Sequence, residues 1–409
     1  MKNLNELTKR IIELRKTDQA QITLLAVCPN SSAVLEAAVK IASLNNMPML
    51  FAATLNQVDW DGGYTGWTPS QFVAELNCYA QKYNWAGPLY PCLDHGGPWL
   101  KDVHTLKGLS LLETMNSLKQ SLIACIDAGY KLLHIDPTVD RTLPAGSPVP
   151  LEIVVERTIE LISHAENHIS QKGLPSISYE VGTEEVHGGL VDYSRFESFI
   201  IQLRNNLEKR NLIHAWPCFV VAQVGTALDT SYFDPDAARR LYDTLSPLGS
   251  LAKGHYTDGV ENLEAYPQTG MGGANVGPEF TIEEYNALNS LSQKEMAMAG
   301  HRKDIASSNF MKVLQQAVLD SGRWKKWLQP EEKGKDFSEL TKLRQVWLVQ
   351  TGCRYIWTDS SVLAAREKLY ENLSTLIDDP GNYVVDWICR SMDKYINAFN
   401  LFDSLKLLS

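Results

Sequence analysis

Short apolar runs in this chain end, one after another, in a side chain that could bind a metal ion or move a proton. Helix-like stretches separate the runs, so strand, functional group and helix alternate along the sequence. In a (β/α)8 barrel the carboxyl-terminal ends of all strands converge on one rim, so this alternation predicts a single site for the chemistry. The side chains concerned are Asp94, His95, Asp136, Glu180, Gln223, His255 and Asn275.

The elements that must position these side chains fit a (β/α)8 TIM barrel in residues 1–300. A doubly wound open sheet is the alternative, but the GxGxxG turn expected after its first strand is absent. Strand alternation stops after residue 300, so residues 301–409 are predicted to form an aromatic-rich C-terminal helical extension. We expect the extension to pack across one end of the barrel or to build a subunit interface. The predicted strands are 22–28, 48–54, 88–93, 131–136, 176–182, 217–225, 250–255 and 270–277.

The composition is that of an ordinary soluble globular protein. The chain is 44% hydrophobic and 21% charged, and its net charge of −10 disfavours nucleic acid and anionic membranes as partners. Residues 1–20 are typical of a polar helix, neither a signal peptide nor a membrane span. The seven cysteines are scattered without a CxxC pair, which favours reduced thiols in a cytoplasmic protein.

The pair Asp94 and His95, in the segment LDHGG, is the sharpest local signal. A neutral imidazole at a strand end can ligate zinc, and the adjacent carboxylate can act as a general acid or base. The alternative is a buried histidine satisfied by a backbone carbonyl. His255 favours the functional interpretation, because one rim would then hold two histidines and several carboxylates. Glu180, if it points into the barrel, must be paired or bound to metal.

The remaining candidates each have two interpretations. Asp136 is either an active-site acid or the start of the turn before Pro137, and Glu185 is either catalytic or part of a solvated loop. Gln223 and Asn275 could hold sugar hydroxyls or fill a polar barrel layer. The segment DGGYTGW could be a mobile lid or a rigid Ω-loop. The histidines without a comparable context are expected to be structural or on the surface: His104, His134, His164, His168, His214 and His301.

Several motifs together resemble the accessory-subunit family of class II tagatose-bisphosphate aldolases. They are PNSSAVLEAAVKIASLNNMPMLFAATLNQVD, NQVDWDGGYTGWTP, LDHGG, YEVGTEEVHGG, HYTD and NVGPEFT. The resemblance covers nearly all of residues 15–300. More distantly, the chain resembles the catalytic class II aldolases, which are zinc-dependent barrels that cleave ketose bisphosphates. That resemblance implies Asp94 as the proton-transferring acid and His95 and His255 as metal ligands.

Two departures from the catalytic aldolases concern the metal site and the phosphate site. Leu228, in GTALD, stands where those enzymes have a third zinc-binding histidine, and HYTDGVEN replaces their Gly-rich phosphate-binding turn. A non-catalytic partner and an enzyme with a rebuilt site both fit these departures. Members of the accessory-subunit family are also implicated in C4 epimerisation of ketohexoses or their 6-phosphates, by retro-aldol cleavage and re-addition.

These observations favour an enzyme, a metal-dependent ketohexose or ketohexose-6-phosphate C4 epimerase. The alternative is a non-catalytic subunit that stabilises a class II tagatose-1,6-bisphosphate aldolase, and a third candidate, a sugar-phosphate kinase, lacks a P-loop. The partners expected are the ketose or its phosphate, a class II aldolase catalytic subunit, or further copies of the chain. Zinc is the expected metal, with manganese, cobalt or nickel as alternatives. The predicted roles are metal ligation by His95, Glu180 and His255, proton transfer by Asp94, Asp136 and Glu185, and sugar binding by His187, Gln223 and Asn275.

Overall fold

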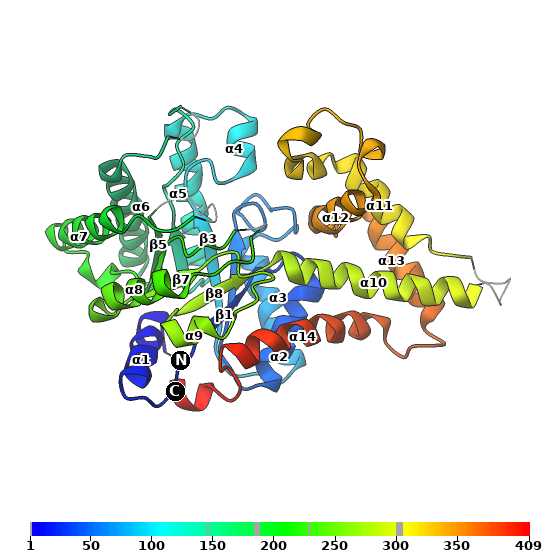
Figure 1. Ribbon diagram of the computed structural model, residues 1–409, viewed down its shortest axis with the longest axis horizontal. Helices are drawn as coiled ribbons and strands as arrows, with labels where there is room; N and C mark the ends of the chain where they lie inside the picture. The colour runs from blue at the N-terminus through cyan, green and yellow to red at the C-terminus, as the bar shows by residue number, and fades with distance from the viewer. Residues whose placement is uncertain (1, 145–146, 184–188, 228–229, 300–305) are drawn as a thin grey trace.

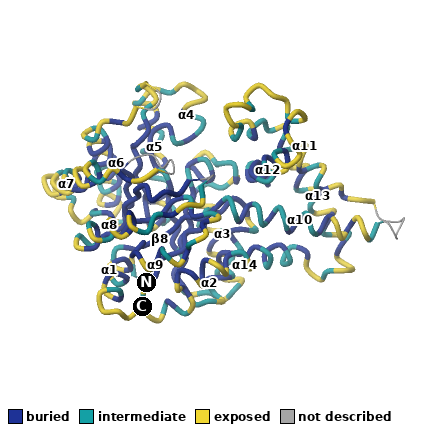
Figure 2. Tube along the Cα trace, in the orientation of Figure 1, coloured by how far each residue is buried: buried dark blue, intermediate teal, exposed yellow. Residues whose placement is uncertain are grey.

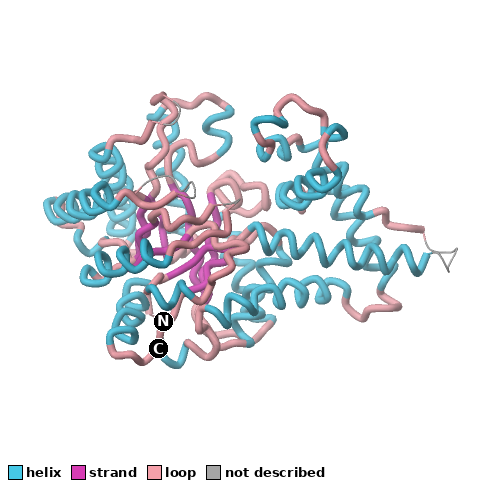
Figure 3. The backbone as a smooth tube through the Cα atoms, in the orientation of Figure 1, coloured by secondary structure: helices cyan, strands magenta, loops and turns pink. Residues whose placement is uncertain are grey.

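A closed parallel barrel forms the centre of the protein (Figures 1 and 3). The structure, a computed structural model, describes residues 2–144, 147–183, 189–227, 230–299 and 306–409. Within this part of the chain eight strands pair in sequence order, and β8 pairs back onto β1. The predicted (β/α)8 barrel is therefore confirmed. The strands are β1 (Leu24–Val27), β2 (Met49–Thr54), β3 (Leu89–Gly96), β4 (Leu132–Ile135), β5 (Ser178–Gly182), β6 (Phe219–Val221), β7 (Leu251–Gly254) and β8 (Gly273–Val276).

Helices surround the strands, and several of them begin at a residue whose side chain caps the first turn. Thr68 caps α3 by accepting a hydrogen bond from the Gln71 amide, and Pro69 occupies the first turn, where its missing N–H costs nothing. Among the described helices, none combines the length and the apolar character that crossing a bilayer requires. The barrel helices are α1 (Leu4–Lys16), α2 (Ser32–Leu44), α3 (Pro69–Lys82), α4 (Asp102–Leu106), α5 (Leu111–Asp127), α6 (Leu151–Lys172), α7 (Tyr193–Lys209), α8 (Pro235–Leu245), α9 (Ala265–Thr269) and α10 (Pro278–Ala299).

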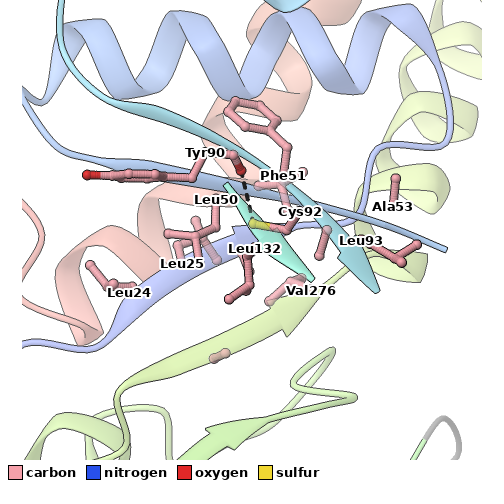
Figure 4. Close-up of a cluster of buried hydrophobic side chains, with 14 of the residues drawn as sticks. Leu24, Leu25, Leu50, Phe51, Ala53, Tyr90, Cys92, Leu93, Leu132 and Val276 are labelled. Atoms are coloured by element: carbon pink, nitrogen blue, oxygen red, sulfur yellow. Dashed lines mark hydrogen bonds between the residues drawn. The ribbon is translucent and has the colours of Figure 1, made fainter. Parts of the chain in front are cut away.

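The hydrophobic core runs through the strands and the inner faces of the helices. Figure 4 shows Leu25, Leu50, Cys92, Leu132 and other strand side chains packed together, and all four are at most 1% exposed. The tube in Figure 2 is buried through the barrel and exposed on the outer stretches of α6, α7 and α8. Burial of this apolar surface is the main stabilisation that holds the strand ends in place.

The C-terminal extension shares the core of the barrel. Helix α14 lies along α10 and α2, and the Thr23 amide donates to the Phe399 carbonyl at 3.2 Å, just ahead of β1 (Figure 1). Trp324 and Trp357 are each 4% exposed, so these aromatic side chains of the extension pack inside the chain. The predicted boundary at residue 300 falls in 300–305, outside the described residues, and the two-part division stays a prediction. The extension contains α11 (Phe310–Ser321), α12 (Lys342–Gly352), α13 (Ser360–Leu373), α14 (Pro380–Ala398) and α15 (Leu405–Leu408), with short 3-10 segments that include η3 (Arg323–Trp327) and η6 (Cys353–Tyr355).

A buried carboxyl group joins α10 to the start of α2. Glu284 is fully buried and accepts a hydrogen bond from Ser31, the residue that caps α2, while the Arg366 guanidinium lies 3.7 Å away. Burial raises the pKa of Glu284 to about 7. The folded protein therefore binds this proton more tightly than the unfolded chain, whose carboxyl has a pKa of about 4.5. The resulting stabilisation is complete in acid and is lost as the pH rises through about 7.

The variant Glu284→Gln should remove this pH dependence, because an amide cannot ionise. The measured quantity is the free energy of unfolding of the variant minus that of wild type. We expect this difference to be larger at pH 8 than at pH 5 by on the order of 3 kcal/mol. Chemical unfolding at the two pH values measures the change. Glu371→Gln, on an exposed part of α13, serves as the control and should show the same difference from wild type at both. A pH-independent effect of Glu284→Gln would contradict the assignment.

Candidate functional site

An irregularity in β3 turns Asp94 and His95 toward the same place. Neighbouring residues of a regular strand point to opposite faces, but the β3–β4 register shifts between Leu93 and Gly96, and His95 has a φ of 51°. Such a left-handed conformation is costly for a residue with a Cβ and is often found at functional sites. The following Gly97 fits because a Cβ there would lie 1.7 Å from the Asp136 carbonyl oxygen. The segment LDHGG thus encodes the bend as well as the functional groups.

The other strand ends use regular alternation. His134 and Asp136 are two residues apart at the end of β4, and Lys253 and His255 are two apart at the end of β7, so each pair shares a face. Glu180 on β5 is fully buried beside them. These strand ends bring six predicted residues together: Asp94, His95, Asp136, Glu180, His255 and Asn275.

Three imidazole rings form the centre of the site. The ring centroids are 4.8 Å apart for His95 and His255, 5.1 Å for His95 and His134, and 5.2 Å for His134 and His255. Asp94 completes the group, in which one potential ligand atom from each of the four residues lies within 4.8 Å of the others. We call Asp94, His95, His134 and His255 the rim cluster. Its spacing and its nitrogen-rich donors are compatible with a metal site.

Hydrogen bonds determine which ring nitrogens face the middle of the rim cluster. Nδ1 of His95 lies 2.7 Å from Asp136 Oδ2, and Nε2 of His255 lies 3.0 Å from Glu180 Oε1. Each of these nitrogens must carry a proton to bond to its carboxylate, so the other nitrogen of each neutral ring has a free lone pair. Those two nitrogens, His95 Nε2 and His255 Nδ1, face each other at 3.1 Å. Two lone pairs at this distance need a cation between them, either a proton or a metal ion.

The charges in the site also favour a cation. Burial opposes ionisation of Asp94, but His95 and His255 hold the pKa of its carboxyl well below the usual value. Burial likewise opposes ionisation of Glu180, yet Lys253, with Nζ at 2.7 Å, and the imidazoles lower its pKa to about 2. Burial also opposes ionisation of Asp136, while its hydrogen bond with His95 and the neighbouring imidazoles bring its pKa to about 2. The three negative charges of these carboxylates exceed the two positive charges of the buried Lys253 and a single imidazolium, so the site has room for further positive charge.

The proton between the two facing rings belongs to His95. Burial disfavours a charged imidazole at both rings, but the carboxylates of Asp94 and Asp136 outweigh it and raise the pKa of His95 to about 9. For His255 burial prevails and lowers the pKa to about 4. The rim cluster therefore holds one proton that a bound metal ion would have to replace.

Asn275 supports Asp94, whereas Gln223 lies against a different segment. The Asn275 amide donates to Asp94 Oδ2 at 3.2 Å, and its own buried side-chain oxygen has no partner among the described residues. The side-chain oxygen of Gln223 accepts a hydrogen bond from the Gly189 amide at 3.1 Å. Glu185, His187 and Leu228 lie outside the described residues, so their predicted roles stay predictions.

His134, for which the sequence predicts a structural or surface position, is fully buried and lies in the site. His134 belongs to the rim cluster, and its Nδ1 lies 3.3 Å from Asp94 Oδ1 and accepts from the His95 amide at 3.1 Å. Lys253, also missed, engages the second oxygen of Glu180. Both oxygens of Glu180 already have protein partners, so its role as third ligand of a metal ion stays a prediction. His134, which belongs to the rim cluster, is the alternative third ligand.

The loop of residues 55–68 forms one wall of the site. Thr65 donates to the Gln57 carbonyl at 2.6 Å, and a Cβ on Gly63 would lie 2.0 Å from that carbonyl oxygen. The Tyr64 hydroxyl bonds to Asn30, and the Tyr64 ring packs edge-on against Tyr355 with centroids 5.0 Å apart. This close packing favours the rigid-loop interpretation over a mobile lid.

One cavity connects the rim cluster to the C-terminal extension. Asp94, His95 and His255 line it together with four residues that follow residue 320. Asp102 on α4 joins the two parts, because it pairs with Arg323 at 2.8 Å and Lys326 at 2.9 Å. The extension thus forms part of the wall around the site. Its lining residues are Lys326, Trp327, Arg354 and Tyr355.

Comparison with known proteins gives a family and a fold. The model of the family described as D-tagatose-1,6-bisphosphate aldolase subunit GatZ/KbaZ-like matches residues 8–399. The structure is similar to a probable tagatose 6 phosphate kinase from Sinorhizobium meliloti 1021, with 21% identity, a TM-score of 0.75, and coverage of 92% of this chain and 100% of that one. It is also similar to the fructose-bisphosphate aldolase of Campylobacter jejuni, with 12% identity, a TM-score of 0.57, and coverage of 98% and 95%.

At these identities the two solved structures support the fold alone. The family match spans nearly the whole chain, including the C-terminal extension. The chain therefore belongs to the GatZ/KbaZ-like family of D-tagatose-1,6-bisphosphate aldolase subunits.

Proposed function

We propose that this protein is a metal-dependent C4 epimerase of ketohexoses or ketohexose 6-phosphates. The observation that carries the proposal is the pair of facing nitrogens on His95 and His255, each ring held by its own carboxylate. Such carboxylate–histidine pairs are typical of metal ligands. A scaffold protein would have no physical need for this buried arrangement, which costs desolvation energy.

His95 and His255 would hold the metal, with His134 and Asp94 as further ligands in reach. Zinc suits a site rich in imidazole, and manganese, cobalt or nickel remain alternatives. When bound, a divalent metal would act as a Lewis acid on the C2 carbonyl of a ketose and stabilise an enediolate. Asp136 and Glu180 would fix the ring orientations of His95 and His255 through the hydrogen bonds already described.

Asp94 is the proposed base for the C4 hydroxyl. Its carboxylate stays ionised at neutral pH and lines the cavity, and Asn275 holds its Oδ2. Transfer of the hydroxyl proton to Asp94 allows the C3–C4 bond to break, giving an aldehyde and a three-carbon enediolate. Rotation of the aldehyde and re-formation of the bond invert C4, and the proton returns from Asp94 to the oxygen. Direct removal of the C4 hydrogen is less favourable, because C4 is not adjacent to the C2 carbonyl.

The family supports a second candidate, a subunit that assembles with a class II aldolase and performs no chemistry itself. On that alternative the rim cluster is a relic, and the partner is a catalytic subunit or further copies of the chain. The first solved neighbour is described as a probable kinase, but this sequence contains no P-loop.

The deciding experiment uses the purified protein without any partner. It is incubated with zinc, manganese, cobalt or nickel and a panel of ketohexoses and their 6-phosphates, and products are identified by NMR. We expect interconversion of C4 epimers that stops on chelation of the metal. Absence of any product, together with stabilisation of a class II aldolase on mixing, would favour the accessory role.

A further inference from the structure

Arg354 brings a positive charge into the cavity of the rim cluster from a distant part of the chain. It lies in η6 between α12 and α13, which stand together on the side of the molecule away from α6–α8 (Figure 1). Its side chain lines the same cavity as Asp94, His95 and His255, and the residue is only 9% exposed. Charged groups are rarely buried to this extent without a partner of opposite charge.

Among the described residues, no carboxylate forms an ion pair with Arg354. Its Nε donates to the Thr351 carbonyl at 2.8 Å, and its guanidinium lies 4.9 Å from the ring centroid of Trp327 and 5.5 Å from that of Tyr355. The described hydrogen bonds use neither of its two terminal nitrogens. Their four N–H groups form a planar fork whose geometry matches the oxygens of a phosphate or carboxylate.

Several other charged groups in this region have partners of opposite charge or hydrogen-bond donors. Arg323 and Lys326 share Asp102, and Arg344 holds Glu332 at 2.8 Å. Asp258, a carboxylate of the same cavity, accepts hydrogen bonds from the Gly277 and Glu279 amides at 3.0 and 2.8 Å. Arg354 is therefore a buried cation without an anionic partner in the described part of the chain, and a bound anion would remove the cost of leaving it unpaired.

We propose that Arg354 binds the phosphate group of the substrate. The assignment of a sugar phosphate rests on the proposed function, whereas the binding of an anion rests on the geometry of Arg354 alone. Lys326, which shares the Asp102 carboxylate with Arg323, lines the same cavity and adds to its positive charge. The C-terminal extension would then provide the phosphate site that the HYTDGVEN segment lacks, and the epimerase would select ketohexose 6-phosphates over free ketohexoses.

Inorganic phosphate is the probe, and thermal unfolding of the full-length protein is the measurement, with chloride at matched ionic strength as the reference. Phosphate should raise the melting temperature of wild type and leave that of Arg354→Met unchanged. In phosphate-free buffer Arg354→Met should melt at or above the wild-type temperature, because it removes an unpaired buried charge. Arg354→Lys, which keeps the charge but loses the fork, should respond partially. Arg390→Met, an exposed arginine on α14, should retain the full response.

Kinetics provide a second readout where turnover is found. We expect Arg354→Met to raise KM for the 6-phosphate by about ten- to hundredfold, with kcat little changed and no effect on the free ketohexose. An Arg354→Met protein that melts lower but keeps its phosphate response would overturn the proposal in favour of a structural role. A stronger Arg354-dependent response to a hexuronate than to phosphate would overturn the phosphate assignment. A phosphate response without turnover would refute the epimerase but support the anion site.

Discussion

A His255→Ala protein, purified gently alongside wild type, should contain little or no divalent metal. His255 provides one of the two facing nitrogens, so its removal leaves His95 without the second nitrogen. Loss of a second-shell partner commonly weakens metal binding 10- to 100-fold, and loss of a ligand should cost at least about as much. The buried pair Glu180–Lys253 remains, so the barrel should keep its fold. Elemental analysis after gel filtration measures the metal, and circular dichroism checks the fold.

Matched histidine variants separate ligation from a general loss of stability. His95→Ala should lose metal to the same extent as His255→Ala, and His134→Ala should lose it if the third imidazole is a ligand. His214→Ala, whose ring is exposed and pairs with Glu166, should bind metal like wild type. Metal contents that are equal in wild type, His95→Ala and His255→Ala, or the absence of metal from all three, would refute the site.

The barrel could be predicted from the sequence because its signals are local and repeated. Each strand is a short apolar run, and several helices carry their own capping residues, such as Ser31 for α2 and Thr68 for α3. Parallel strands must place their carboxyl ends on one rim, so six of the predicted site residues meet without any knowledge of loop structure. The barrel topology thus brings residues that are far apart in the sequence into one site.

The missed residues differ in how far they could have been foreseen. If Asp136 and His255 face the inside of the barrel, then His134 and Lys253, two positions earlier, must do so as well. The alternation rule alone would therefore have predicted that His134 and Lys253 lie in the site. By contrast, the left-handed His95 and the register shift in β3 depend on contacts between strands. Arg354 reaches the cavity from a segment about a hundred residues beyond His255, and no local pattern indicates that.

Asp94→Asn should lower turnover by about two to four orders of magnitude if the protein is an epimerase. The amide keeps the size of the side chain but cannot accept the C4 hydroxyl proton. Asp94 is 4% exposed and belongs to the rim cluster, so the substitution could also change metal binding or stability. Metal content and melting temperature must therefore be measured with the rate, and only a loss of kcat at full metal occupancy assigns Asp94 to proton transfer. Asp243→Asn, an exposed change on α8, should behave like wild type.

The accessory alternative predicts a different pattern for the same variant. A non-catalytic subunit is inert alone, and Asp94→Asn would leave the activity and lifetime of a partner aldolase unchanged. Isotopes then test the chemistry of any epimerase activity. Cleavage and re-formation of the C3–C4 bond leave the hydrogen on C4 in place, so a reaction run in deuterium oxide should give an epimer without deuterium at C4. Deuterium at that carbon would require a proton to leave C4 itself, and Asp94 would then have to act on a C–H bond instead of a hydroxyl group.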